Sequence, residues 1–138
     1  MNESHRNKVY RTNNKDKLAL KYKQYCKTIR GKFNKILKDI RKRAGTVITI
    51  EDLETLWVKQ NGKCALTGLQ MTYDHTGSSL DAVTIDRIDP AGLYNLINIR
   101  LVSKWANMAR SSLADDDFVS WCRLVVNGAT DGYTREES

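Results

Sequence analysis

Apolar residues recur at helical spacing between residues 17 and 44. Successive positions lie three or four residues apart, which places them on one face of a helix. These positions are Leu18, Tyr22, Tyr25, Ile29, Phe33, Ile36, Ile40 and Ala44. The pattern predicts one long helix that is interrupted near Gly31 and ended by Gly45. The same spacing permits a coiled coil, and therefore a homodimer through residues 17–44.

After this helix the hydrophobic pattern predicts shorter elements. Thr49 lies three residues before Asp52, which is the spacing of a helix-capping box, so a short helix is predicted to begin there. The turn residues Asn61-Gly62 are predicted to end it. A turn-rich segment follows, in which residues 69–73 are a candidate short strand.

Residues 83–112 are predicted to form a strand, a loop, a strand and a helix. The strands are VTIDRI (83–88) and NIRLVS (98–103), and the helix begins in KWANMARSSL. A last helix carries Asp115–Asp117 in its first turn, where carboxylates interact favourably with the helix dipole. The predicted fold is therefore α+β and mainly helical. The large aromatic side chains assigned to its core are Trp57, Trp105, Trp121 and Phe118.

The length and composition limit the class of protein. The 138 residues are enough for one domain with a modest core. No run of about 18 apolar residues exists, so no membrane association is expected. The N-terminus is polar and basic and has no secretory signal, so a cytoplasmic protein is expected. The three cysteines are widely spaced without a CxxC pair, so no structural zinc is expected.

Positive charge is concentrated in the N-terminal third. Residues 1–45 hold 15 Lys/Arg against 3 Asp/Glu, whereas residues 46–138 hold 8 against 13. A basic arm on a slightly acidic body indicates a protein that binds a phosphate backbone. The alternative is a solvated basic helix that only keeps the protein soluble. The cations expected to contact nucleic acid are Lys27, Arg30, Lys35, Lys38, Arg41, Lys42 and Arg43.

Side chains that carry carboxylate or amide oxygens are concentrated in the predicted strand–loop–strand–helix unit. Asp86 lies on the first strand, Asn98 opens the second, and Asn107 lies on the following helix. In so small a unit all three are expected to face one volume. Asp89 precedes Pro90 and is expected to initiate a turn.

This arrangement resembles the HNH, or ββα-metal, nuclease family, which is common in phages and mobile elements. Asp86-Arg87 stands at the Asp-His position of the family's first strand, Asn98 at its central position and Asn107 at its helix position. Arg110 stands where the family often has a lysine, so it is counted with the DNA-contacting cations.

Two further segments carry the resemblance. KCALTG (63–68) is similar to the Cys, then Thr-Gly entry of many members, and GLYNLINIRLV resembles a segment that they share. Ser103 stands where some members have a zinc-ligating cysteine, so structural zinc is again not expected. The resemblance implies a ββα-metal domain at 49–128, after a flexible arm and basic amphipathic helix at 1–48 and before a loose tail at 129–138.

The resemblance implies a metal-dependent DNA endonuclease or nicking enzyme of phage or mobile-element origin, with RNA as an alternative substrate. Asp86 and Asn107 would hold Mg²⁺ or Mn²⁺ through oxygen atoms. Asn98 would orient the catalytic loop by hydrogen bonds to backbone. Other interpretations of these residues remain: Asp86 pairing with an arginine, Asn107 on a helix surface, and Asn98 in a simple turn.

Arg87 departs from the family pattern. The family's histidine takes a proton from the attacking water, but arginine has no acceptor lone pair and stays protonated. Arg87 would instead contact the scissile phosphate, pair with Asp89 or Asp74, or mark a loss of catalysis. His75 is a candidate replacement base, or simply an exposed loop histidine. A divalent ion that lowers the pKa of water is another route.

Two rival functions therefore stand beside the nuclease. One is a catalytically degenerate HNH-fold protein that binds or regulates nucleic acid through its basic arm. The other is a protein-interaction factor whose apolar helix stripe docks on a partner. The arginine at position 87 favours these rivals, whereas the joint presence of Asp86, Asn98 and Asn107 favours the enzyme.

Overall fold

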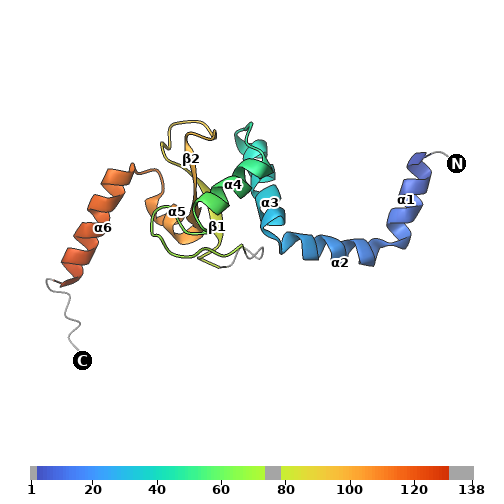
Figure 1. The fold of residues 1–138 in the computed structure, drawn as a ribbon, viewed down its shortest axis with the longest axis horizontal. Helices are drawn as coiled ribbons and strands as arrows, with labels where there is room; N and C mark the ends of the chain where they lie inside the picture. The colour runs from blue at the N-terminus through green and yellow to red at the C-terminus, as the bar shows by residue number, and fades with distance from the viewer. Residues whose placement is uncertain (1–2, 74–78, 131–138) are drawn as a thin grey trace, which may run out of the picture.

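The computed structural model describes residues 3–73 and 79–130. Its elements are α1 (Glu3–Asn13), α2 (Lys15–Cys26), α3 (Ile29–Arg43), α4 (Ile50–Lys59), β1 (Val83–Arg87), β2 (Ile99–Ser103), α5 (Lys104–Arg110) and α6 (Asp115–Thr130). The prediction of an α+β, mainly helical fold is confirmed. Figure 1 shows a central body with α1 and α2 extending from one side and α6 from the other.

The two strands form an antiparallel hairpin that runs directly into α5. Val83 pairs with Ser103 at one end of the ladder, and Asp86 faces Arg100 near the other. Ser103 then caps α5, because its side chain accepts a hydrogen bond from Ala106 N. Both predicted strands and the predicted helix are confirmed, and the short junction fixes α5 against the hairpin.

The predicted start and stop of α4 are also confirmed. Thr49 and Asp52 form a reciprocal capping box at its first turn. The chain leaves the helix through Asn61 and Gly62, which both have positive φ. The weaker strand prediction at 69–73 is wrong, since only isolated bridges form there, between Lys63 and Gln70 and between Thr72 and Ala82.

The core lies between α3, α4 and the hairpin. Phe33 and Leu37 of α3 are fully buried, as are Leu53 of α4 and Leu101 of β2. At about 25 cal/mol per Å² of buried apolar surface, side chains of this kind supply most of the folding free energy. Helix α3 thus belongs to the packed body, although the predicted domain division at residue 48 grouped it with the flexible arm.

The long N-terminal helix is divided close to the interruption that was predicted near Gly31. Thr28 has an extended backbone and its hydroxyl accepts from Gly31 N, so α3 starts anew after α2 has ended. The break precedes the predicted position, Gly31, by three residues. Only the α3 part of the apolar stripe is buried, and Tyr22 on α2 is 61% exposed. Residues 3–13, expected to be part of a flexible arm, form helix α1.

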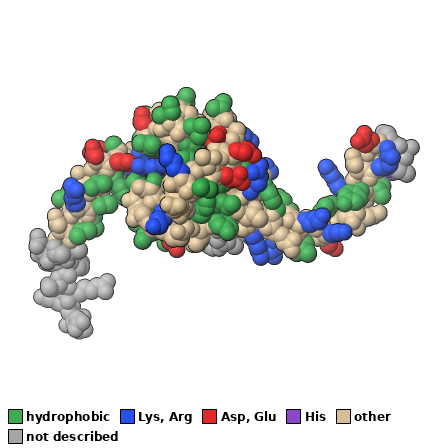
Figure 2. Space-filling view, in the orientation of Figure 1, with side chains coloured by type: hydrophobic (Ala, Val, Ile, Leu, Met, Phe, Trp, Pro, Cys, Tyr) green, Lys and Arg blue, Asp and Glu red, His purple; other side chains and the backbone are tan. Residues whose placement is uncertain are grey.

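The C-terminal helix α6 packs little against the body. Trp121 is 60% exposed and Trp105 is 37% exposed, so their assignment to the core is wrong. Phe118 and Trp57 are partly buried. Figure 2 shows the blue Lys and Arg side chains spread along the arm that α1 and α2 form. Among the helices at 3–73 and 79–130, none combines the length and apolar character needed to cross a membrane.

Candidate functional site

A polar pocket of about 210 Å³ opens where the hairpin, its loop, α3 and α5 meet. Strand β1 contributes residues 85–87, and the loop that follows contributes two more. The lining residues are Arg43, Ile85, Asp86, Arg87, Pro90, Tyr94, Asn107 and Ser111. Three of the residues that the sequence predicted for the site, Asp86, Arg87 and Asn107, therefore meet in one pocket.

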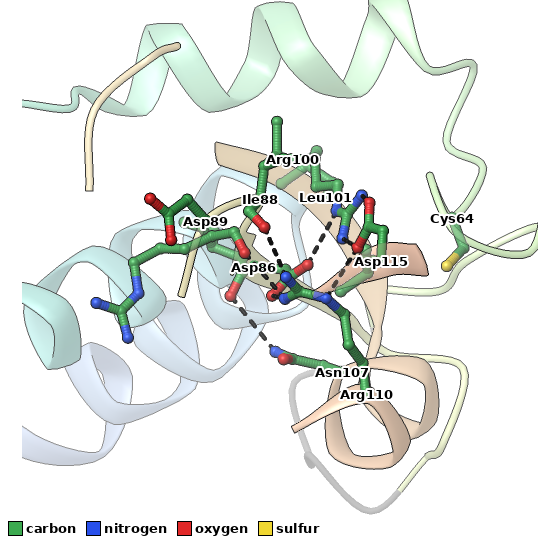
Figure 3. Close-up of polar contacts among 12 residues, drawn as sticks. Cys64, Asp86, Ile88, Asp89, Arg100, Leu101, Asn107, Arg110 and Asp115 are labelled. Atoms are coloured by element: carbon green, nitrogen blue, oxygen red, sulfur yellow. Dashed lines mark hydrogen bonds and ion pairs between the residues drawn. The ribbon is translucent and has the colours of Figure 1, made fainter. Parts of the chain in front are cut away.

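Asp86 is buried and both of its carboxylate oxygens are engaged by arginines. Arg100 Nε donates to Oδ2 at 2.9 Å, and Arg110 Nη1 donates to Oδ1 at 2.7 Å. Only 5% of Asp86 is exposed. A buried carboxylate needs such partners, because an unpaired charge is costly in a low-dielectric interior. Figure 3 shows the two guanidinium groups converging on Asp86.

Arg110 lies inside the protein, which corrects its assignment to the DNA-contacting cations. Its exposure is 1%. Its guanidinium donates to the carbonyl oxygens of Arg87 at 2.9 Å and Ile88 at 2.6 Å, in addition to Asp86. Arg110 thereby joins α5 to the end of β1, because its guanidinium N–H groups donate to carbonyl oxygens at the point where the strand ends.

Asp115 completes a network of alternating charges. Its two oxygens accept from Arg100 Nη1 and Nη2, both at 2.6 Å, and Oδ1 lies 2.9 Å from Arg110 Nε. The hydrogen bond from Arg100 holds the pKa of Asp115 below its ordinary value, and the same pairing raises the pKa of Arg100. Neither Arg100 nor Asp115 was predicted for the site. The only local signal was the acidic first turn of α6.

Arg87 takes up a position at the pocket wall. Its Nη1 donates to Gly92 O at 3.0 Å, and its guanidinium carbon lies 4.9 Å from the centre of the Tyr94 ring. The ring contact is a cation–π interaction, which helps to hold the guanidinium beside Tyr94. Within residues 3–73 and 79–130 no ion pair joins Arg87 to Asp89. Asp74, the other predicted partner, lies outside the described residues.

Asn98 fixes the loop that carries Tyr94. Its Oδ1 accepts from Asp89 N at 2.8 Å, while its Nδ2 donates to Asp89 O at 3.1 Å and Leu93 O at 3.0 Å. These are the backbone hydrogen bonds expected of this residue. Asp89 Oδ1 accepts from Ala91 N at 2.9 Å, so Asp89 does initiate the turn.

Asn107 faces β1 from α5. Its Nδ2 donates to Thr84 Oγ1 at 3.1 Å and Ile85 O at 3.4 Å. Because the amide nitrogen is used toward the strand, the amide oxygen remains as the side chain's acceptor on a pocket-lining residue. His75, the candidate base, lies outside the described residues.

The cations of the basic helix that were predicted to contact DNA are exposed in the structure. They are Lys27, Lys35, Lys38, Arg41, Lys42 and Arg43. Arg30 is exposed as well, but it pairs with Glu51 at 2.6 Å and Glu54 at 2.8 Å, which offsets its charge locally. Arg43 ends α3 at the pocket, so the basic surface and the pocket are continuous.

The pocket offers two oxygen-bearing side chains to a small divalent ion, but it also places arginines beside them. Asp86 and Asn107 both line the pocket, and each carboxylate oxygen retains acceptor capacity after accepting one hydrogen bond. Proteins commonly hold Mg²⁺ by one or two carboxylates together with phosphate oxygens and waters. Because Arg43 and Arg87 line the same pocket, a divalent ion there would add to a local excess of positive charge, which a bound phosphate would offset only in part.

No family model matches the chain, and no curated protein or solved structure matches it either.

Proposed function

We propose that the chain is a metal-dependent nuclease of the HNH type that hydrolyses phosphodiester bonds in DNA. One observation carries this proposal: Asp86, Arg87 and Asn107 line a single pocket at the junction of β1 and α5. These are three of the five residues that the sequence predicted for catalysis and metal binding, the others being Asn98 and His75. The order hairpin, then helix supports a ββα-metal core, and Arg43 supplies a second guanidinium to the same pocket.

The arginines of the pocket bind the substrate phosphate in this proposal. A guanidinium makes charge-assisted hydrogen bonds to phosphate oxygens, and these strengthen as negative charge builds in the transition state. The hydrogen bond to Gly92 and the Tyr94 ring orient Arg87 beforehand. Asn98 holds the loop that presents Tyr94, so it positions the phosphate-binding group through the backbone.

Asp86 and Asn107 would hold Mg²⁺ or Mn²⁺ beside that phosphate. Such an ion, when bound, stabilises charge on phosphate and lowers the pKa of water. Arg110 and Arg100 hold the Asp86 carboxylate in place through ion pairs. The chain's own candidate for a proton acceptor is His75, since Arg87 has no lone pair to offer.

The exposed cations of α2 and α3 supply affinity for the nucleic-acid backbone. Contacts of this kind are tolerant of sequence and weaken steeply with salt, because each one releases a counterion. DNA is the proposed substrate and RNA the alternative. A homodimer would have to form through α2, because the apolar stripe of α3 is used in the core.

A second candidate function is a nucleic-acid-binding protein that has lost catalysis. The observation that favours it is the pairing of both Asp86 oxygens with arginines, which neutralises the principal candidate metal ligand. In that case the pocket binds a phosphate and releases it unchanged.

A plasmid-nicking assay with Mg²⁺ or Mn²⁺ separates the two functions. We expect conversion of supercoiled to open-circular DNA by the wild type, loss of it with EDTA, and loss of it in Asn107→Ala. Lys59→Ala is the matched control, because Lys59 is an exposed residue of α4 that does not line the pocket and is not among the proposed DNA-contacting cations, so this variant should retain most activity. Asn107→Ala is preferred to Asp86→Ala, since the latter also leaves Arg110 without its buried partner.

Two results of this assay would contradict the nuclease proposal. If the wild type retards DNA on a gel but no metal produces nicks, the chain is the binding protein. Nicking that persists unchanged in both Asn107→Ala and Arg87→Ala would show that the reaction occurs elsewhere, and the pocket would lose its proposed role.

A further inference from the structure

The loop that joins β1 to β2, residues 88–98, presents apolar side chains to solvent. Ile97 is 91% exposed and Leu93 is 77% exposed, and Ile88 and Leu96 of the same loop are exposed as well. Figure 2 shows hydrophobic side chains at the top of the body, over this loop as Figure 1 draws it. Single exposed aliphatic residues are ordinary, but several within one short loop mark a contact surface.

Hydrogen bonds hold this loop in one conformation. Asn95 Oδ1 accepts from Ile97 N at 3.1 Å and from Asn98 N at 3.0 Å. Thr46, in the link between α3 and α4, donates its hydroxyl to Tyr94 O at 2.8 Å. These contacts add to the backbone hydrogen bonds that the Asn98 side chain makes. The exposed side chains therefore stand on a fixed backbone, so little conformational entropy is lost when they enter a partner.

The surroundings of the loop indicate nucleic acid as the partner. Tyr94 and Pro90 of the loop line the polar pocket together with Arg43 and Arg87. Arg43 ends α3, whose exposed cations lead up to the pocket. In a duplex whose phosphates lie on these cations, the stacked bases are the apolar surface within reach of the loop. Aliphatic side chains have no hydrogen-bonding group with which to read a base edge, so their use there is to pack between bases.

We propose that the loop is a wedge that opens a base step of duplex DNA, with Ile97 inserted and Leu96 packed beside it. Ile97 is assigned the inserted position because it is the most exposed of the aliphatic side chains in the loop. The wedge makes the chain selective for DNA that is easily unstacked. The inference deepens the proposed function and rests on its DNA binding, but it requires neither a metal ion nor cleavage.

The preference follows from the free energy of opening the stack. Inserting an apolar side chain unstacks and kinks a duplex, which opposes binding. The opposition is smallest at a mismatched pair, and it is smaller at TA and CA steps than at other matched steps. A chain with the wedge should therefore bind a mismatched duplex at least about fivefold more tightly than a matched one. A chain that contacts phosphates alone should bind the two almost equally.

Two duplexes that differ only in a central T·T mismatch test this preference. Each carries an end label for anisotropy and a 2-aminopurine beside the central pair, whose fluorescence rises when the base unstacks. The affinity of the full chain for each duplex would be measured in EDTA, so that no cleavage occurs. We expect tighter binding to the mismatched duplex and a rise in 2-aminopurine fluorescence when the protein binds it.

Ile97→Ser and Val58→Ser form a matched pair of variants. Both residues are exposed and β-branched, but Val58 is 72% exposed on α4 and lies outside the loop and the pocket lining. Ile97→Ser should bind the two duplexes within about twofold of each other and should abolish most of the fluorescence rise. Val58→Ser should behave as the wild type. Thermal unfolding should be alike in all three proteins, because neither substitution changes a buried side chain.

The possible failures are distinguishable. Equal wild-type affinity for the two duplexes overturns the wedge and does not affect the nuclease proposal. A preference that survives in Ile97→Ser overturns the wedge too, because the mismatch is then recognised elsewhere. If Ile97→Ser abolishes self-association and leaves DNA binding unchanged, the loop is a contact between protein chains and the wedge is wrong. A preference that Ile97→Ser abolishes, in a chain that never nicks plasmid, supports the wedge and refutes the nuclease. Absence of binding to either duplex refutes both.

Discussion

Arg110 connects three parts of the site through a single guanidinium group. It contacts Asp86 on β1, two carbonyl oxygens at the end of that strand, and Asp115 at the start of α6. A buried ion pair of this kind stabilises the fold little more than well-packed apolar residues would. Removing the arginine alone is costly, however, because it leaves a buried carboxylate without its partner. Its value to the protein lies in fixing the geometry around Asp86.

Replacing Arg110 by methionine should therefore destabilise the fold strongly. We expect a loss of about 3–5 kcal/mol in the free energy of unfolding, because Asp86 loses one of its two partners inside the protein. Urea denaturation followed by tryptophan fluorescence measures this. Lys42→Met is the surface control and should change stability by less than about 0.5 kcal/mol. A loss of under about 1 kcal/mol for Arg110→Met would mean that the network is not held as described.

Asp115 should make the stability depend on pH in acid. Its folded pKa is lowered below the ordinary value of 3.8, chiefly by the hydrogen bond from Arg100. The stabilisation is therefore complete above that ordinary value and is lost as the pH falls through the folded pKa. Asp115→Asn should melt at a lower temperature than the wild type near neutral pH, and the difference should shrink in acid. A difference that does not change with pH would contradict the pairing.

The sequence identified some of these residues and missed others for a physical reason. Asp86 and Asn107 lie on neighbouring elements, so their meeting followed from the order strand, loop, strand, helix. Arg100 could be paired with Asp86 only through the register of the hairpin, and Asp115 only through the path of the chain after α5. Neither is fixed by local sequence pattern, and for the same reason Arg110 was taken for a surface cation.

The turns show how single elements are specified. Gly62 and Gly68 both have positive φ, at 66° and 70°, where a side chain is strained. They differ in their surroundings. A Cβ on Gly62 would lie 2.5 Å from Gln70 Nε2 and 2.9 Å from the Trp57 ring, whereas nothing lies within 4 Å of the position at Gly68.

Alanine at these two glycines should separate strain from crowding. Gly68→Ala should cost about 1 kcal/mol, which is the penalty for the left-handed conformation alone. Gly62→Ala should cost about 2–4 kcal/mol, since overpacking against Trp57 adds to the same strain. Paired thermal or urea unfolding curves give the comparison. Equal losses would show that Gln70 and Trp57 move aside freely.

The division between α2 and α3 illustrates the limit of a periodicity argument. The apolar spacing continues without change across the break, so it cannot reveal where a helix stops. The signal was a capping threonine, Thr28, whose side chain accepts from Gly31 N and donates to Tyr25 O. The stripe reaches the core only through its α3 part, where Phe33 and Ile40 are buried and Ile29 and Ile36 are partly buried. That contact depends on residues far along the chain, such as Leu53 and Leu101.

Across the whole molecule, positive charge is concentrated on the N-terminal side of the body and negative charge at the start of α6. The arm formed by α1 and α2 is basic, and none of its described side chains is buried. Residues 1–27 hold eight Lys/Arg against two Asp/Glu. At the opposite end, α6 begins with three aspartates and carries no basic residue in its last turn. Nucleic acid is therefore expected on the arm and pocket side only.

Removing charge from the arm should change how binding depends on salt. In a variant with glutamine at Lys15, Lys17, Lys21 and Lys23, DNA affinity should fall and the slope of log affinity against log salt should flatten. Each lost phosphate contact should remove about 0.9 from that slope. Fluorescence anisotropy at several salt concentrations measures both. Glutamine at Lys59 and Lys63 on the body is the control, and an equal effect there would contradict binding along the arm.

The arm extends from one side of the body, so a complex of the proposed kind with duplex DNA would be asymmetric. Helices α1 and α2 contain 11 and 12 residues, or about 35 Å of helix at 1.5 Å per residue. Because α1 turns away from the direction of α2 in Figure 1, the reach along a duplex is set mainly by α2, at about 18 Å, or roughly five base pairs of about 3.4 Å each. Because the arm leaves one side of the body, as Figure 1 shows, a single bound chain should leave a lopsided hydroxyl-radical footprint. At a site that fixes the orientation of the bound chain, protection should reach about half a helical turn further on the arm side of the pocket than on the other side.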